Sequence, residues 1–184
     1  VQSGIGKVQA GITTSTLINE FHVEAVINSG SAGGIGTGLS VGDIVVATET
    51  AYHDVDVTTS GYTMGQLPGF SARFPASSAL GDKIIKAAQA SGVNAHRGLI
   101  VSGDQFIADT KRIAEIKQNF PDALCSEMEG AAVGQVAYQN KVPYAVIRAM
   151  SDVGDEDAEV SFDKFIITAG KKSGQMLIDL FKNE

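Results

Sequence analysis

The chain has 184 residues, of which 43% are hydrophobic and 19% are charged, a composition that predicts one soluble globular domain and argues against disorder. A formal net charge of −7, with lysines and arginines scattered, argues against binding to a nucleic-acid backbone. No apolar run approaches the ~18 residues of a membrane helix, and residues 1–20 lack the apolar core of a signal peptide.

Cysteine usage indicates the compartment. Cys125 is the single cysteine, so the chain has no internal disulfide framework and no cysteine-rich zinc site. A reducing, cytoplasmic location is the expectation that follows.

Helical and strand patterns alternate along the chain. Apolar residues at helical spacing predict helices at 5–21, 79–90, 111–119, 127–139 and 162–181, the first buried on more than one side. Short runs rich in β-branched residues predict strands at 23–28, 44–47, 51–57, 96–102, 124–126 and 142–150. Residues 58–75, with three glycines and two prolines, predict a long functional loop.

This alternation predicts an α/β domain with a largely parallel sheet. Ligands of such sheets bind beyond the carboxyl ends of the strands. Three polar clusters, at 29–34, 126–129 and 151–155, follow predicted strands, so we expect one pocket to collect them.

The glycine-rich stretch "GSAGGIGTG" (30–38) resembles a nucleotide-binding loop only superficially. A dinucleotide or phosphate-binding loop leads into a helix, whereas a strand pattern, "DIVVA", follows here. Two interpretations remain: a loop whose amides and Ser31 hydroxyl approach a small polar ligand, or a turn that needs positive φ.

The sequence gives only weak signals for a metal site or a nucleophilic cysteine. In "YHDVD" (52–56) a strand would send His53 and Asp54 to opposite faces, and no third ligand follows at suitable spacing, so we expect no metal site. Cys125 lies in a short apolar strand and is expected to be a core residue rather than a nucleophile.

The stretch "SEMEG" (126–130) places two carboxylates at the entry to an apolar helix. At a strand end Glu127 and Glu129 would share one face, with Met128 opposite, and an ionised carboxylate there can accept both hydroxyls of a ribose diol. Acidic residues at a helix N-terminus also complement the helix dipole without any ligand. This stretch alone leaves both interpretations open.

The stretch "RAMSD" (148–152) favours the interpretation in which the carboxylates of "SEMEG" bind a ligand. A buried strand would deliver Arg148, Ser151 and Asp152 at its carboxyl end. A carboxyl group withdrawn from water has a raised pKa and can remain protonated, as a general acid must.

Taken together, the motifs resemble a known family. "SGIGKV", "NSGSAGG", "VGDIVVATE", "YHDVDVT", "GLIVSGDQFI", "SEMEGAAV" and "IRAMSD" occur in the order and spacing of the bacterial 5′-methylthioadenosine/S-adenosylhomocysteine nucleosidases, of the purine nucleoside phosphorylase-like superfamily. The resemblance implies a three-layer α/β/α fold with a central mixed, mostly parallel sheet. It also implies hydrolysis of an N-glycosidic bond that releases adenine from a 5′-thio-substituted ribose, without metal or organic cofactor.

The resemblance also implies residue roles. Asp152 would protonate adenine N7 as the base leaves, with Ser151 orienting it. Phe106 and the backbone of Ile107 would hold the adenine, and Met128 and Glu129 the ribose. The remaining implied contacts are Ser31 and Arg148 near the attacking water, and Ile5 and Phe162 at the 5′ substituent.

Two further implications concern assembly and completeness. The resemblance implies a homodimer in which residues 58–70, including Tyr62 and Pro68, close the partner's pocket. The family's N-terminal segment, with its first strands and a water-activating glutamate, is not found before "SGIGKV". We therefore expect residues 1–184 to be a single, N-terminally incomplete domain with little activity alone.

Two alternative functions remain compatible with the sequence. A nucleoside phosphorylase would use phosphate in place of water, which requires several cations around the anion, and only Arg148 is evident near Ser31. A nucleoside-binding protein would keep the fold without the chemistry.

Overall fold

The computed structural model describes residues 1–153 together with Gly174 and Ile178. The helix predicted at 162–181, and with it Phe162, lies outside the described residues apart from those two positions. The described helices are α1 (Lys7–Phe21), α2 (Ser78–Ala90), α3 (Thr110–Asn119) and α4 (Gly130–Gln139), with a 3₁₀ turn η1 (Thr58–Ser60). The described strands are β1 (Val26–Gly34), β2 (Ile44–Tyr52), β3 (Phe74–Pro75), β4 (Ala95–Ser102), β5 (Ala123–Glu127) and β6 (Tyr144–Asp152).

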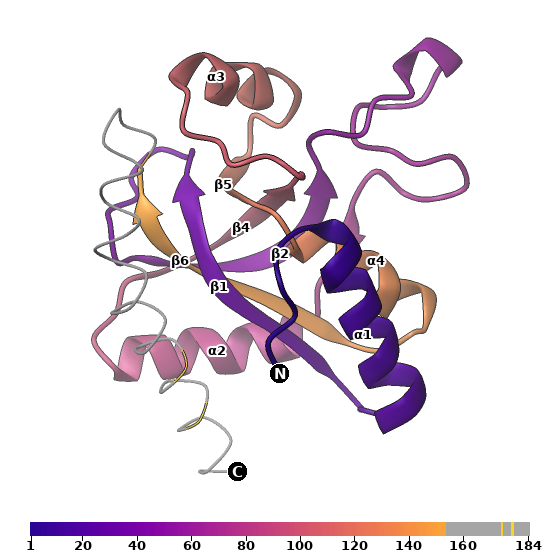
Figure 1. Cartoon of the computed structure of the whole chain (residues 1–184). Helices are drawn as coiled ribbons and strands as arrows, with labels where there is room; N and C mark the ends of the chain where they lie inside the picture. The colour runs from indigo at the N-terminus through magenta and orange to yellow at the C-terminus, as the bar shows by residue number, and fades with distance from the viewer. Residues whose placement is uncertain (154–173, 175–177, 179–184) are drawn as a thin grey trace.

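The strands form one mixed sheet in the order β3-β2-β4-β5-β1-β6, and β2 also pairs with β6 (Figure 1). This extra pairing closes β2, β4, β5, β1 and β6 into a ring, with β3 outside it. The long pairings β1–β6, β2–β4 and β4–β5 are parallel, and the shorter β1–β5, β2–β3 and β2–β6 are antiparallel. The expected mixed, mostly parallel sheet is confirmed.

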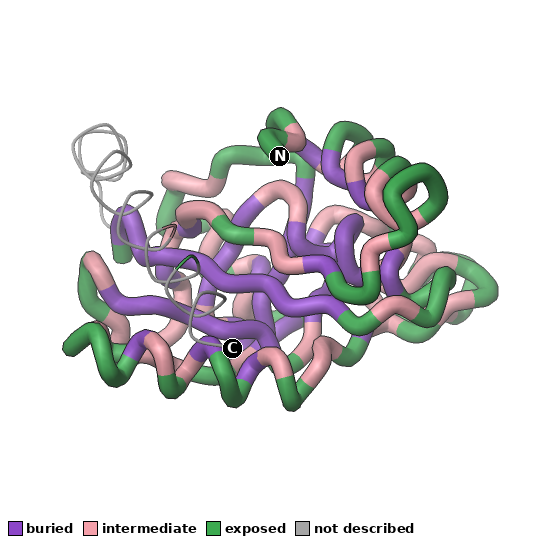
Figure 2. Tube along the Cα trace, turned by 90° about the horizontal axis from the view of Figure 1, so that it is seen from below, coloured by how far each residue is buried: buried purple, intermediate pink, exposed green. Residues whose placement is uncertain are grey.

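Alternating side chains of the strands separate two helical layers. Val45 and Ile100 pack on the side of α4, whereas their neighbours Val46 and Leu99 pack on the opposite side. On that opposite side α2 supplies Ile84 and Ala88, α3 supplies Ile116, and Phe120 follows the end of α3. Helix α1 packs on α4. In Figure 2 the buried strands accordingly run through the middle of the molecule between exposed outer segments.

Four predictions of local structure were wrong. Strand β1 continues through "SGSAGG" rather than ending in a glycine loop, because residues 26–33 pair with β6 and Gly34 pairs with β5. The segments 44–47 and 51–57 contain one strand, β2, which spans a bulge and ends at Tyr52. Helix α4 begins at Gly130 rather than at Glu127. Helix α1 is not buried on more than one side, since Val8 and Ile12 remain 70% and 57% exposed.

Candidate active site

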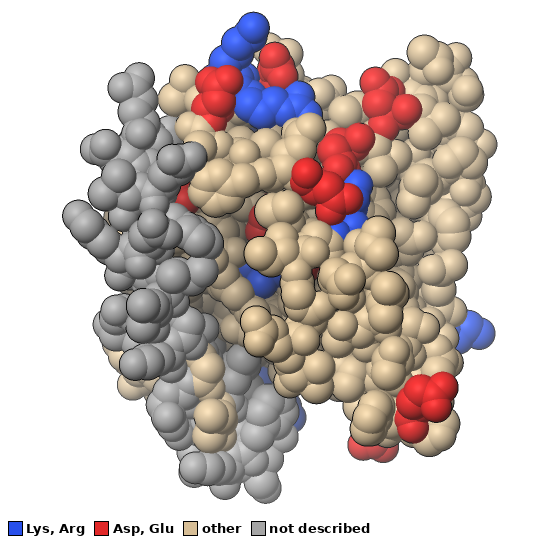
Figure 3. Space-filling model, viewed as in Figure 1, with Lys and Arg blue, Asp and Glu red and all other residues tan. Residues whose placement is uncertain are grey.

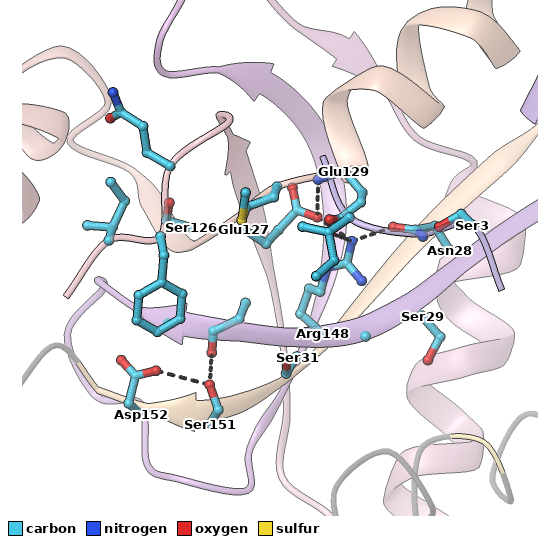
Figure 4. A pocket seen from close by; sticks show the side chains of 18 of the residues that line it. Ser3, Asn28, Ser29, Ser31, Ser126, Glu127, Glu129, Arg148, Ser151 and Asp152 are labelled. Carbon is cyan, nitrogen blue, oxygen red and sulfur yellow. Dashed lines mark hydrogen bonds and ion pairs between the residues drawn. The ribbon is translucent and has the colours of Figure 1, made fainter. Parts of the chain in front are cut away.

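A cavity of about 520 Å³ lies where β1, β5 and β6 end (Figure 4). Figure 3 shows acidic and basic atoms at the bottom of a recess in the middle of one face of the molecule. In Figure 4, Asp152 and Ser151 lie at one end of the pocket, Ser3 and Asn28 at the other, and Arg148 and Glu129 between them. The lining comprises Ser3, Gly4, Ile5, Asn28, Ser29, Gly30, Ser31, Ala32, Gly33, Gln105, Phe106, Ile107, Ser126, Glu127, Met128, Glu129, Arg148, Ser151 and Asp152.

Glu127, the last residue of β5, has hydrogen-bond or ion-pair partners at both carboxylate oxygens. Its two carboxylate oxygens accept hydrogen bonds from the Gly130 amide at 2.9 and 2.8 Å, and Oε2 accepts a third from the Glu129 amide at 3.1 Å. The Ser102 hydroxyl donates to Oε1, and Arg148 forms an ion pair with Oε2. These partners occupy the acceptor sites of the carboxylate, so Glu127 is saturated by the protein itself.

Arg148 is the cation of this cluster, and its side chain is 2% exposed. The guanidinium donates to Asn28 Oδ1 as well as to Glu127. It crosses β1 at Gly30, where an added Cβ would clash with Nη1. The glycine is therefore needed for close approach, and its φ is not positive.

Glu129 has fewer hydrogen-bond partners than Glu127. It occupies the N-cap position of α4, its Oε1 accepts the Gly6 amide at 2.9 Å, and its Oε2 lies 3.5 Å from Arg148 Nη2. Burial raises the pKa of this carboxyl above its ordinary value of 4.5, and the neighbouring charge of Glu127 adds to the rise. A carboxylate at the cavity with free acceptor capacity can bind hydroxyl groups of a ligand.

Asp152 and Ser151 end strand β6 and are 3% and 1% exposed. The Ser151 hydroxyl oxygen lies 3.0 Å from Asp152 Oδ2 and 3.2 Å from the Ala32 carbonyl. This serine fixes the orientation of the aspartate at the edge of the cavity. An acidic group held there can deliver a proton to a bound ligand.

A second polar cluster supports the rim of the cavity. Lys7 Nζ lies 2.7 Å from Asp54 Oδ2 and 3.6 Å from Asp104 Oδ2, and 5.4 Å from the centre of the Tyr52 ring. Asp104 Oδ1 accepts the Lys7 amide, and Asp54 Oδ2 accepts the Asp104 amide. Burial alone would raise the pKa of Asp54, but the hydrogen bonds from Lys7 and Asp104 outweigh it and hold that pKa below 3.8. The cluster joins the start of α1 to the loop that carries Phe106 and Ile107.

Most of the predicted site residues line this one cavity. Ten of them do so: Ile5, Ser31, Phe106, Ile107, Glu127, Met128, Glu129, Arg148, Ser151 and Asp152. Tyr62 and Pro68 do not line it, and Phe162 lies outside the described residues. The roles assigned to all thirteen remain predictions.

The structure adds two polar residues that the sequence did not single out, Asn28 and Ser102, and it places Ser126, part of the predicted polar cluster 126–129, in the cavity lining. Asn28 binds Arg148 and Ser102 binds Glu127, whereas Ser126 lines the cavity and its buried hydroxyl has no hydrogen-bond partner within the described residues. A polar residue inside an apolar strand pattern, as in "VIN", was the signal that could have identified Asn28.

His53 and Cys125 are both buried. His53 follows β2 instead of lying in it, so the expected opposition of His53 and Asp54 across a strand was wrong. Burial lowers the pKa of His53 and raises that of the Cys125 thiol, and Cys125 is a core residue as predicted.

No group of three or more metal-ligating side chains occurs within the described residues, nor does any helix there have the length and apolarity to cross a membrane.

Comparison with known proteins decides the family. The profile of the phosphorylase superfamily matches residues 1–182. A 5′-methylthioadenosine/S-adenosylhomocysteine nucleosidase of Actinobacillus succinogenes is 49% identical over 180 residues, covering 98% of this chain and 78% of the relative. The chain belongs to the 5′-methylthioadenosine/S-adenosylhomocysteine nucleosidase family of the phosphorylase superfamily.

Solved structures of this nucleosidase family share the fold. The Neisseria meningitidis nucleosidase, in complex with methylthio-immucillin-A, has a TM-score of 0.94 and 47% identity, and the match covers 99% of this chain and 79% of that one. The Colwellia psychrerythraea nucleosidase, in complex with adenine, has a TM-score of 0.93 and 42% identity, covering 98% and 75%. The α/β fold expected from the sequence is thereby confirmed.

Proposed function

We propose that this protein hydrolyses the N-glycosidic bond of 5′-methylthioadenosine and S-adenosylhomocysteine, releasing adenine and the 5-thio-substituted ribose. The observation that carries the proposal is the placement of Asp152 and Glu129 in one cavity: a buried carboxyl group at one end and a partly open carboxylate beside Arg148. Membership of the nucleosidase family supplies the substrate class.

The chemistry requires two things of the protein. The departing purine must be protonated, and positive charge that develops on the sugar must be stabilised as the glycosidic bond breaks. Asp152, oriented by Ser151, gives its proton to adenine N7. Glu129 accepts the 2′- and 3′-hydroxyls and, as an anion near the sugar, stabilises the oxocarbenium-like transition state.

Other lining residues position the substrate. Phe106, which is 50% exposed, stacks on the adenine, and the Ile107 backbone bonds its edge. Met128 packs on the ribose. Ser31 and Arg148 lie near the attacking water, and Ile5 contacts the 5′-thio substituent, a role also proposed for Phe162.

Glu127 serves a different purpose from the one expected of the pair. Because the protein saturates its oxygens, it holds Arg148 and the start of α4 in place rather than binding ribose directly. The two interpretations of "SEMEG" therefore divide between its two glutamates: Glu127 complements the helix N-terminus, and Glu129 is available to a ligand.

The test uses protein expressed from its complete coding sequence. Asp152→Asn should lower the rate of adenine release from methylthioadenosine by about 10²–10⁴-fold, the usual contribution of a general acid. Affinity for adenine should persist within about tenfold, since asparagine keeps the shape of the side chain. Asp82→Asn, an exposed carboxylate on α2, is the matched control and should keep the full rate. A fully active Asp152→Asn variant contradicts the proposed role.

The same assay separates the alternatives. Arg148 is the one cation that lines the cavity among the described residues, and it is already paired with Glu127, an arrangement that favours water over phosphate. Rates that require phosphate, with ribose 1-phosphate as product, would identify a phosphorylase. Binding of adenine without its release from any substrate would identify a nucleoside-binding protein.

The protein further acts as a homodimer in this proposal. Helix α1 presents Val8 and Ile12 on one exposed face, four residues apart, and a contiguous apolar face of this kind suits a second copy of the chain. Tyr62 and Pro68, in the excursion between β2 and β3, are proposed to close the partner's cavity. Sedimentation of the Val8→Glu/Ile12→Glu variant as a monomer, against a dimeric parent, tests the assembly. A cytoplasmic location stays a prediction, to be checked by cell fractionation.

A further inference from the structure

Ser126 has a hydroxyl group that the rest of the described chain leaves unsatisfied. The residue is 6% exposed, and its Oγ has no hydrogen-bond partner within the described residues. A buried hydroxyl without a partner is unfavourable for folding, so such groups usually have a partner that the isolated chain does not supply. Because Ser126 lines the cavity, a ligand bound there is the natural partner.

The strand register places Ser126 opposite Asp152. Gly33 of β1 pairs with Ser126 of β5 on one side and with Asp152 of β6 on the other. Directly paired residues point to the same face of a sheet, and all three line the cavity. Neighbouring strands are about 4.8 Å apart, so the backbones at Ser126 and Asp152 are about 10 Å apart with one strand between them.

Gly33 keeps the space between these two groups open. A side chain at position 33 would begin with a Cβ only 3.1 Å from Asp152 Oδ1, on the strand that lies between Ser126 and Asp152. With glycine there, a flat ring can lie over β1 and be reached from both neighbouring strands. In Figure 4, Ser126 and Asp152 lie at the same end of the pocket, away from Ser3 and Asn28.

We propose that Ser126 is a base-recognition residue, whose hydroxyl hydrogen-bonds a polar atom on the six-membered ring of the purine while Asp152 addresses N7. This inference rests on the proposed function, because it assumes that a purine occupies the cavity. It assigns to Ser126 a share of base specificity that the motif resemblance did not suggest. The bond forms in bound substrate and in free adenine alike, so it contributes to affinity rather than to the chemical step.

The experiment measures adenine affinity by calorimetry on protein from the complete coding sequence, together with the melting temperature of the ligand-free protein. Ser126→Ala should weaken adenine binding about three- to tenfold, the range for one hydrogen bond. With methylthioadenosine it should raise KM by a similar factor and leave kcat within about twofold. The melting temperature should not fall, because the truncation removes no bond within the described protein.

A matched control has the opposite signature. Thr50 carries a buried hydroxyl that is 3.1 Å from the Tyr144 hydroxyl, outside the cavity lining. Thr50→Val should lower the melting temperature and leave adenine affinity unchanged. If Ser126→Ala behaves like Thr50→Val, its hydroxyl is structural and the proposal is overturned.

Base analogues identify the bonded atom. Purine, 1-deazaadenine and 3-deazaadenine each lack one polar feature of adenine. The analogue that lacks the partner of Ser126 should bind parent and Ser126→Ala equally well, whereas the others should retain the difference. An equal loss for all three analogues overturns the hydrogen bond. If the parent binds adenine but releases none from nucleosides, the hydrolase fails while the Ser126 measurement stands; if it binds no adenine, both fail.

Discussion

The inner wall of the cavity and the cluster that supports its rim both consist of carboxylates paired with a cation, yet they differ in how completely those groups are satisfied. On the inner wall, Glu127 and Arg148 are each 2% exposed and bind one another, Ser102, Asn28 and backbone amides. At the rim, Lys7 joins Asp54 and Asp104, with side-chain exposures of 22%, 14% and 49%.

Glu129 lies between these two clusters and belongs fully to neither. One of its oxygens accepts a hydrogen bond from the Gly6 amide, next to Lys7. The other lies 3.5 Å from Arg148 Nη2, a long distance for a hydrogen bond. The comparison shows that residue type alone does not decide which carboxylate binds a ligand. The decisive property is acceptor capacity left over after the protein has used its own donors.

The largest expected loss of stability comes from removing the Glu127 carboxylate from the inner wall. Glu127→Ala leaves the buried Arg148 charge with only its longer, 3.5 Å contact to Glu129, and removal of one partner of a buried ion pair costs about 3–5 kcal/mol. Urea unfolding should show this loss as a lower midpoint. Asp122→Ala is the matched control, since Asp122 also pairs with an arginine, Arg73, but is 53% exposed, and its loss should be at most ~1 kcal/mol. Equal losses in the two variants would show that burial does not distinguish the two pairs.

The sequence predicted the inner wall only in part. Apolar strands ending in polar residues were sufficient to place Glu127 and the pair Ser151–Asp152 at one edge of the sheet, because strand ends of an α/β fold converge. The tight contact between Glu127 and Arg148 could not be read, since it depends on β1 lying between β5 and β6. That strand order is a property of the tertiary fold and not of any local pattern.

The glycines show the same limit. "SGSAGG" was interpreted as a loop because glycine is common in turns, but Gly30 and Gly33 lie in β1, beneath Arg148 and Asp152. A glycine that makes room for a neighbouring side chain and a glycine that permits a turn are identical in sequence. The prediction that α1 is buried on more than one side failed for a similar reason. Helical spacing identifies an apolar face but does not show whether another part of the protein covers it.

An intermediate effect is expected where the two clusters meet. Glu129→Gln removes the charge that strengthens hydrogen bonds to the ribose diol, so affinity for a methylthioadenosine analogue should fall about 10–100-fold. Affinity for free adenine should remain within about twofold, because adenine has no diol. Calorimetry with both ligands measures the difference, and an equal loss for adenine would place Glu129 at the base instead of the sugar.

The pH dependence sharpens the same test. The pKa of Glu129 is raised by burial, so its protonated form is favoured by folding: its contribution to stability is present at low pH and lost as pH rises through the folded pKa. Ribose binding has the opposite preference, because it needs the ionised form. Affinity for the nucleoside analogue should therefore fall as pH drops through the raised pKa, and Glu129→Gln should abolish that dependence.

The smallest effect is expected at the rim, where water already reaches the charges. Lys7→Met removes the 2.7 Å ion pair with Asp54 and should cost about 1–2 kcal/mol in urea unfolding at pH 7, whereas Lys86→Met, on the exposed face of α2, should change stability by no more than ~0.5 kcal/mol. Because the pKa of Asp54 is held below 3.8, its stabilising contribution exists above that pH and is lost as pH falls through the lowered pKa. The difference between parent and Lys7→Met should therefore shrink from pH 7 to pH 3. An undiminished difference at pH 3 would mean that Lys7 acts through its ammonium group over the Tyr52 ring, a cation–π contact that does not depend on the charge of Asp54, and the ion pair with Asp54 would then contribute no stability.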